Sequence, residues 1–182
     1  MKKIGLRKVI LWGGVFVIIC NIIFNHSITS ITSIENSGRL GIIDENLSLE
    51  YEDLIVLNPV EEIKGNTLTH GDKMVEFAQE YAPNQEIYYY SASDREGIVT
   101  TDRIIKGLEM MKKEGIKVIN ISMSSDIYSA EFEQYILGNQ KQMQIYASYS
   151  NVTESLDYPA MYKGVIGVGK KIVYSKTSYI NA

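Results

Sequence analysis

Cysteine and histidine are both scarce in this chain of 182 residues. Cys20 is its single cysteine, and His26 and His70 are its two histidines. One thiol cannot build a disulfide framework, and this small supply of sulfur and imidazole ligands excludes cysteine-based and multi-histidine zinc sites. We therefore expect no metal site and no cofactor.

Clusters of positive charge are lacking beyond the first ten residues. The chain has 18 lysines and arginines against 22 aspartates and glutamates, which gives a formal net charge of −4. An acidic chain without a basic patch does not attract nucleic-acid phosphates, so we expect no nucleic-acid partner. With 3 prolines, 14 glycines and 45% hydrophobic residues, the composition excludes collagen-like and disordered proteins and is typical of one globular domain.

The N-terminus has the pattern of a membrane-targeting segment. The cations before its apolar run are Lys2, Lys3, Arg7 and Lys8. The apolar run from Val9 to Phe24 follows directly. A basic start before such a run is typical of a secretory signal or of an N-terminal anchor. At a rise of ~1.5 Å per residue the run spans roughly 24 Å, slightly short of the ~30 Å hydrocarbon core of a bilayer.

We predict one hydrophobic helix in residues 1–25, a linker in residues 26–37 and a globular domain in residues 38–182. The positive-inside rule places the domain outside the cell. Two outcomes remain open for localisation. An uncleaved helix would make a single-pass protein of the cell membrane with an extracellular domain, whereas cleavage would release a secreted one.

Short apolar runs and helical stripes alternate from residue 38 onward. The strand-like runs are residues 40–43, 87–90, 118–123, 144–148 and 165–169. The helix-like stripes are residues 70–81, 101–114 and 130–137. This alternation predicts an α/β domain of three layers, with a mostly parallel sheet and helices on both faces.

Polar residues follow several of the predicted strands, where functional groups of such a sheet gather. Asp44 follows the first strand, Ser122–Ser125 the third and Asn151 the fourth, while His70 opens a helix. Each also fits an ordinary role, because an aspartate can cap a turn and a histidine can lie on a helix surface. Periodicity alone does not make them a site.

Six segments carry motifs in a consistent order and spacing. They are Gly41-Ile42-Ile43-Asp44, Thr69-His70-Gly71, and residues 82–88, 118–123, 148–151 and 158–169. Together they cover residues 38 to about 170 and resemble the subtilases, the subtilisin-like serine proteases of peptidase family S8. The resemblance implies a subtilisin-like fold and a serine-type endopeptidase site.

The resemblance also implies a role for each matching residue. Asp44 would orient the imidazole of His70, and His70 would act as the general base. The side-chain amide of Asn151 would donate to the oxyanion of the reaction. An extended peptide would pair as an added strand with the backbone of Ile121, Ser122, Met123 and Ser124.

Several features depart from the family pattern. The Gly-Thr-Ser-Met-Ala run that carries the family's nucleophile does not occur in the sequence. Glu45 follows Asp44 where the family has a small residue, and Asp72 replaces a threonine two residues after His70. Ser124 and Ser150 stand at glycine positions. We therefore expect a truncated subtilisin-like domain that is catalytically inactive as it stands.

Three functions remain open on this basis. The first is an exported, membrane-tethered serine endopeptidase, which requires that the chain is a fragment of a longer product or that the serine comes from another polypeptide. The second is a pseudoprotease that binds a peptide or partner without cleaving it. The third is an immunity-type membrane protein. Without a serine-bearing helix a sheet face would be exposed, and 13 tyrosines suit a partner surface, so association through that face is a further prediction.

Overall fold

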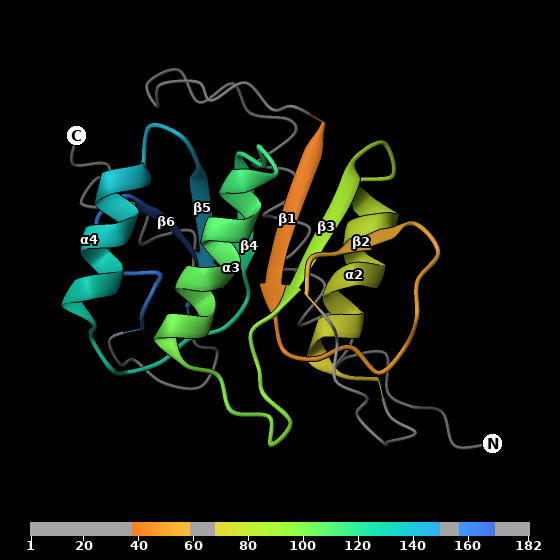
Figure 1. The fold of residues 1–182 in the computed structure, drawn as a ribbon, viewed down its shortest axis with the longest axis horizontal. Coiled ribbons are helices and arrows are strands. Elements are labelled where there is room, and N and C mark those ends of the chain that lie inside the picture. Colours follow the sequence, from red (N-terminus) through yellow and green to blue (C-terminus); the bar gives the residue numbers. More distant parts are fainter. Residues whose placement is uncertain (1–37, 59–67, 150–156, 170–182) are drawn as a thin grey trace.

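The computed structural model describes residues 38–58, 68–149 and 157–169. These form one six-stranded sheet in which all neighbouring strands are parallel, in the order β2-β3-β1-β4-β5-β6 (Figure 1). The strands are β1 (Arg39–Asp44), β2 (Leu54–Val56), β3 (Glu86–Ser91), β4 (Val118–Ile121), β5 (Gln144–Ser148) and β6 (Val165–Val168).

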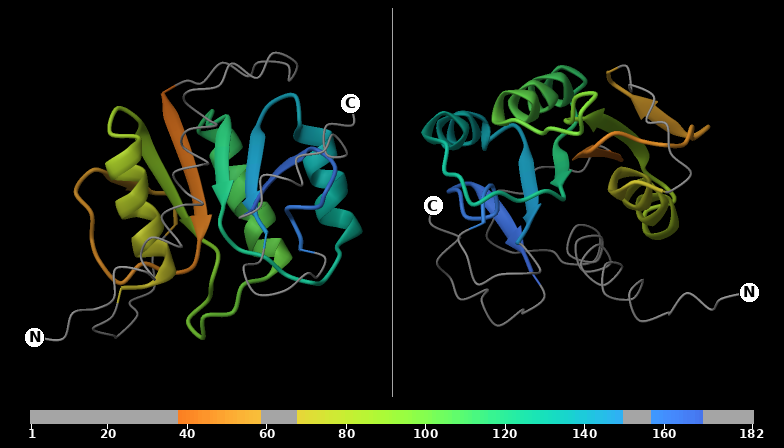
Figure 2. Two further views of the ribbon diagram at one scale, coloured as in Figure 1. Left: turned by 180° about the vertical axis from the view of Figure 1, so that it is seen from behind. Right: turned by 90° about the horizontal axis from the view of Figure 1, so that it is seen from below.

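Helices cover both faces of the sheet, which confirms the predicted three-layer α/β architecture. They are α2 (His70–Tyr81), α3 (Thr101–Lys113) and α4 (Ala130–Asn139). Viewed from below, α3 and α4 lie on one side of the sheet and α2 lies on the other (Figure 2). Parallel strands need long crossover connections, and these helices provide three of them.

Each helix begins at a capping side chain and buries one apolar stripe. The N-cap residues, whose side chains accept a backbone N–H of the first turn, are Thr69, Thr100 and Ser129. Such caps satisfy N–H groups that have no partner inside the helix. The stripe of α3 packs with Phe132 of α4 in one core cluster, and the stripe of α2 packs with Ile42 of β1 in a second. The two clusters lie on opposite faces of the sheet.

Strand β3 contains three consecutive tyrosines, and all of them are buried. Tyr88, Tyr89 and Tyr90 are 7%, 0% and 3% exposed. Tyr88 and Tyr90 belong to the α3 cluster and Tyr89 to the α2 cluster, as expected for a strand whose side chains alternate between faces. The tyrosines of this strand therefore form core.

Apart from shifts of one residue at strand ends, two features of the sheet differ from the prediction. Strand β4 ends at Ile121 rather than at residue 123, and its pairing with both neighbours, β1 and β5, stops at that residue. Strand β2 was not predicted, since it has three residues of which Ile55 and Val56 are exposed. Its strand conformation comes with the backbone pairing to β3, which no local apolar pattern indicates.

The predicted hydrophobic helix of residues 1–25 and the linker of residues 26–37 lie outside the described residues. Among the residues that are described, no helix is both long and apolar enough to cross a membrane.

Candidate active site

Asp44 is the last residue of β1 and is fully buried. The backbone N–H of Glu45 donates to Asp44 Oδ1 at 2.8 Å. Since β1 runs through the middle of the sheet, with β3 on one side and β4 on the other, its carboxyl end opens at the centre of the sheet edge. Asp44 is therefore placed where parallel sheets gather functional groups.

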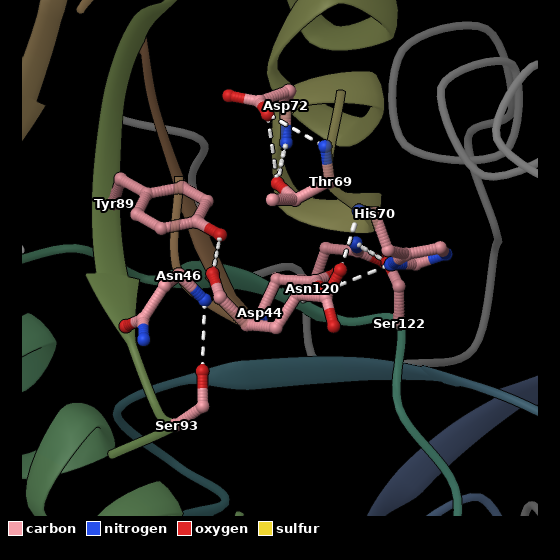
Figure 3. A network of polar contacts seen from close by, with 10 residues as sticks. Asp44, Asn46, Thr69, His70, Asp72, Tyr89, Ser93, Asn120 and Ser122 are labelled. Carbon is pink, nitrogen blue, oxygen red and sulfur yellow. Dashed lines mark hydrogen bonds and ion pairs between the residues drawn. The ribbon is translucent and has the colours of Figure 1, made fainter. Parts of the chain in front are cut away.

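His70 is the first residue of α2, and its ring meets the Asp44 carboxylate. The distance from His70 Nδ1 to Asp44 Oδ1 is 2.9 Å, within hydrogen-bond reach (Figure 3). Burial lowers the pKa of His70, but the hydrogen bond to Asp44 and the charges of Asp44 and Glu45 outweigh it, so the pKa is raised. The arrangement holds Nδ1 protonated and leaves Nε2 as the basic nitrogen.

Asp72 ties the first turn of α2 to the chain that follows β1. Its fully buried carboxylate accepts the Ser48 hydroxyl at 2.5 Å and, at 2.7 and 2.8 Å, the backbone N–H and the hydroxyl of Thr69. The N–H of Leu49 donates to it as well. Burial raises the pKa of Asp72, but the hydrogen bonds from Ser48 and Thr69 outweigh it and the pKa is lowered.

The carboxyl end of β4 brings further polar groups to the same edge. Asn120 is fully buried in β4, and its side-chain amide donates to the hydroxyl of Ser122 just beyond the strand. Because Ile42 of β1 pairs with Asn120, the side chain of Asp44, two residues further along β1, lies on the same sheet face as Asn120. Among the described residues, Asp44 Oδ2 and Asn120 Oδ1 are buried without a hydrogen-bond partner.

A cleft of about 670 Å³ lies over this edge. Its polar lining includes Asp44, Glu45, His70 and Ser122. Its apolar lining includes Ile104, Met123, Ile127, Phe132, Tyr158 and Tyr162. The segment after β4 is held beside the cleft by two backbone hydrogen bonds between Ser125 and Tyr158. The cleft is therefore lined on one part by an imidazole–carboxylate pair and on another by apolar and aromatic side chains.

The sequence profile of the subtilase family matches residues 62–179, well over half of the chain. This chain belongs to the subtilase family. An alkaline protease of Alkalihalobacillus alcalophilus is 31% identical over 90 residues, which are 48% of this subtilase and 24% of that protein.

Solved structures share the fold of this subtilase. A psychrophilic subtilisin-like protease from the Antarctic psychrotroph Pseudoalteromonas sp. AS-11 matches with a TM-score of 0.55 and 13% identity, over 72% of this chain and 36% of that one. A prenylagaramide maturation protease matches with a TM-score of 0.55 and 14% identity, over 71% and 52% of the two chains. A lanthipeptide protease matches with a TM-score of 0.52 and 20% identity, over 71% and 47%.

The subtilase chain spans only part of the length of the proteins that it matches here. It spans 24% of the curated alkaline protease and between 36% and 52% of these three solved chains.

The structure brings together most of the residues that the sequence singled out. Asp44 and His70 are in contact, and both line the cleft with Ser122, Met123 and Ser124. Ile121 is fully buried in β4. Asn151 and Ser150 lie outside the described residues.

Sequence reasoning missed the parts that Glu45 and Asp72 play in this subtilase, because it treated both only as departures from the family pattern. A signal for Asp72 was present. Thr69 followed three residues later by an acidic residue has the form of a capping box, and the structure contains that box. No local pattern marks Glu45, whose partners come from α2 and β3. Within the described part of the chain, no cluster of three or more metal-ligating side chains occurs.

Proposed function

We propose that this subtilase acts on extended peptides through the Asp44–His70 pair, as part of an exported serine-endopeptidase site. The observation that carries the proposal is the position of His70, which contacts Asp44 and lines a cleft shared with Ser122, Met123 and Ser124. A peptide lying along residues 121–124 would pass the imidazole. The aromatic and aliphatic lining favours a peptide with a bulky apolar side chain.

The chemistry follows from the geometry of the pair. His70 would take the proton of a hydroxyl nucleophile and return it to the leaving amine, while Asp44 holds the ring and stabilises the imidazolium. The raised pKa of His70 favours that cation. General base catalysis of this kind contributes typically 10²- to 10⁴-fold.

We further propose that these 182 residues bind peptide but do not form an acyl-enzyme by themselves. No Gly-Thr-Ser-Met-Ala run occurs in the sequence. Asp44 Oδ2 and Asn120 Oδ1, which find no hydrogen-bond donor among the described residues, support a site that a further donor completes, because a buried unpaired acceptor costs about 1–3 kcal/mol. A bound peptide, or a segment carrying the nucleophile, would supply that donor.

A serine-directed fluorophosphonate probe tests the absence of acylation. The full chain and its His70→Ala variant are incubated with the probe, and labelling is measured by mass spectrometry. We expect the same background labelling in both, because such probes react with a hydroxyl that a neighbouring base activates. Stoichiometric labelling that disappears in His70→Ala would show a complete catalytic site and overturn this part of the proposal.

Peptide binding is tested separately, with a matched pair of variants at Ser124. Ser124→Pro removes a backbone N–H from the segment that would pair with the peptide, whereas Ser124→Ala keeps it. We expect Ser124→Pro to weaken the binding of an apolar hexapeptide by about tenfold, the loss expected from one main-chain hydrogen bond. Ser124→Ala should bind like the parent. Equal affinity in both variants would exclude strand pairing at this segment.

We also propose that residues 1–25 export and tether the domain, on the strength of the cations and the apolar run in the sequence. An alkaline phosphatase reporter, which is active only after export, is joined after Ala182. We expect activity in the membrane fraction, and no activity when residues 1–25 are deleted. Activity in the medium would indicate cleavage and secretion, and activity of a cytoplasmic reporter at the same position would contradict export.

A further inference from the structure

Glu45 joins Asp44 and His70 in a closed ring of hydrogen bonds. The backbone N–H of Glu45 donates to Asp44 Oδ1 at 2.8 Å, and the same oxygen lies 2.9 Å from His70 Nδ1. The backbone N–H of His70 donates to Glu45 Oε1 at 2.5 Å. Two consecutive residues at the end of β1 therefore hold the histidine at its ring and at its backbone.

Glu45 is itself fixed by a hydrogen bond from β3. Its carbonyl oxygen accepts the hydroxyl of Tyr89, which is fully buried. The next residue of α2 is Gly71, where a Cβ atom would lie 2.8 Å from the carbonyl oxygen of Glu45 and clash with the Tyr89 hydroxyl. The start of α2 thus sits directly on Glu45 and Tyr89, with no room for a side chain between them.

We propose that Glu45 is a positioning residue for His70, which fixes the backbone of the histidine against β1 and places a second carboxylate beside the imidazole. The importance of this for catalysis rests on the proposed function. The N-terminus of a helix carries a partial positive charge and free N–H groups, which disfavour a cation there. A carboxylate that accepts one of these N–H groups offsets that charge, so the imidazolium formed during proton transfer is stabilised.

Other charged groups also act on the imidazole. Burial lowers the pKa of His70, the hydrogen bond and charge of Asp44 raise it, Glu45 raises it and Lys73 on α2 lowers it. Removing the Glu45 charge therefore leaves one carboxylate opposing Lys73 and the burial of the ring. The pKa of His70 should then fall.

The test uses the full chain in detergent micelles with His26→Ala, so that His70 is its single imidazole. The pKa and the Nδ1–H signal of His70 are measured by NMR. Glu45→Gln removes the charge but keeps an oxygen for the His70 N–H, and we expect a lower pKa with the Nδ1–H signal retained. Glu45→Ala removes both, and we expect a lower pKa with faster exchange of the Nδ1 proton.

Glu80→Gln is the matched control, because Glu80 is an exposed carboxylate near the other end of α2. We expect it to leave the pKa and the Nδ1–H signal of His70 unchanged. An unchanged pKa in both Glu45 variants, or an equal fall in Glu80→Gln, would overturn the proposal. The readout involves neither peptide nor probe, so a failure of peptide binding would contradict the proposed function and leave this result standing.

Discussion

His70 Nδ1 lies 2.9 Å from Asp44 Oδ1, although 26 positions separate the two residues in the chain. Asp44 ends β1 in the centre of the parallel sheet and His70 begins α2, so the contact joins a strand end to a helix start. The aspartate is buried and 24% of the histidine side chain remains exposed. A buried carboxylate that holds a cleft-facing imidazole is the arrangement that proton transfer to and from a bound molecule requires.

The Asp44–His70 contact should make stability depend on pH. Because the pKa of His70 is raised from 6.5 in the folded chain, the contribution is fully present below that value and is lost as the pH rises through the folded pKa. We expect the free energy of unfolding in urea to fall as the pH rises above about 6.5 and through the raised pKa of His70. In Asp44→Asn this fall should be smaller. An equal pH dependence in the parent and the variant would show that the contact contributes nothing to folding.

Removing the Asp72 carboxylate should destabilise the start of α2. Asp72→Ala leaves the buried donors of Ser48 and Thr69 without their acceptor, and we expect a loss of about 3 kcal/mol in the free energy of unfolding. The matched control is Asp102→Ala, in the exposed first turn of α3, which should cost less than about 1 kcal/mol. Similar losses in the two variants would contradict the importance of the buried contacts.

Asp72 should also contribute to stability at the acidic end of the pH range. Its pKa is lowered from 3.8 in the folded chain, so its contribution is present above that value and is lost as the pH falls through the folded pKa. We expect the parent to lose more stability than Asp72→Asn on acidification, as measured by thermal unfolding. A larger loss of thermal stability on acidification in Asp72→Asn than in the parent would contradict the lowered pKa of Asp72.

The fit between α2 and β3 should be sensitive to one methyl group at Gly71. A Cβ atom there would clash with the Tyr89 hydroxyl and crowd the Glu45 carbonyl oxygen, and we expect Gly71→Ala to cost about 2 kcal/mol. In a Tyr89→Phe background the hydroxyl is gone, so the cost should fall by about 1 kcal/mol. A double-mutant cycle from urea unfolding measures this coupling. Strict additivity would show that the Tyr89 hydroxyl does not limit the space at residue 71.

The three helices among the described residues could be predicted from the sequence because each has an apolar stripe that must be buried. Ile104, Leu108 and Met111 recur at helical spacing, and all three are in the core. The buried strands could be predicted for a similar reason, since parallel strands covered on both faces form short continuous apolar runs. Strand β2 lacks such a run, and its pairing with β3 is a tertiary contact.

The contacting residues Asp44 and His70 were also recognisable in the sequence, because the motifs around them resemble those of the subtilases. Their contact was an expectation that the structure confirms. The contacts of Glu45, and the contact of Asp72 with Ser48, could not be predicted in the same way. Glu45 Oε1 reaches the His70 N–H across 25 positions, and Asp72 reaches Ser48 across 24.

The sequence by itself therefore determined the family, the layered α/β architecture and the two residues, Asp44 and His70, that the structure brings into contact. These follow from local periodicity and from short motifs, each of which occupies a single run of the chain. Only the tertiary structure decided that Glu45 accepts the His70 N–H, that Asp72 accepts the Ser48 hydroxyl, and that β4 ends at Ile121. The same holds for the hydroxyl of Tyr89, which donates to the carbonyl oxygen of Glu45. Those outcomes depend on which strand ends lie next to which helix starts. The order of the parallel strands in the sheet decides these neighbours.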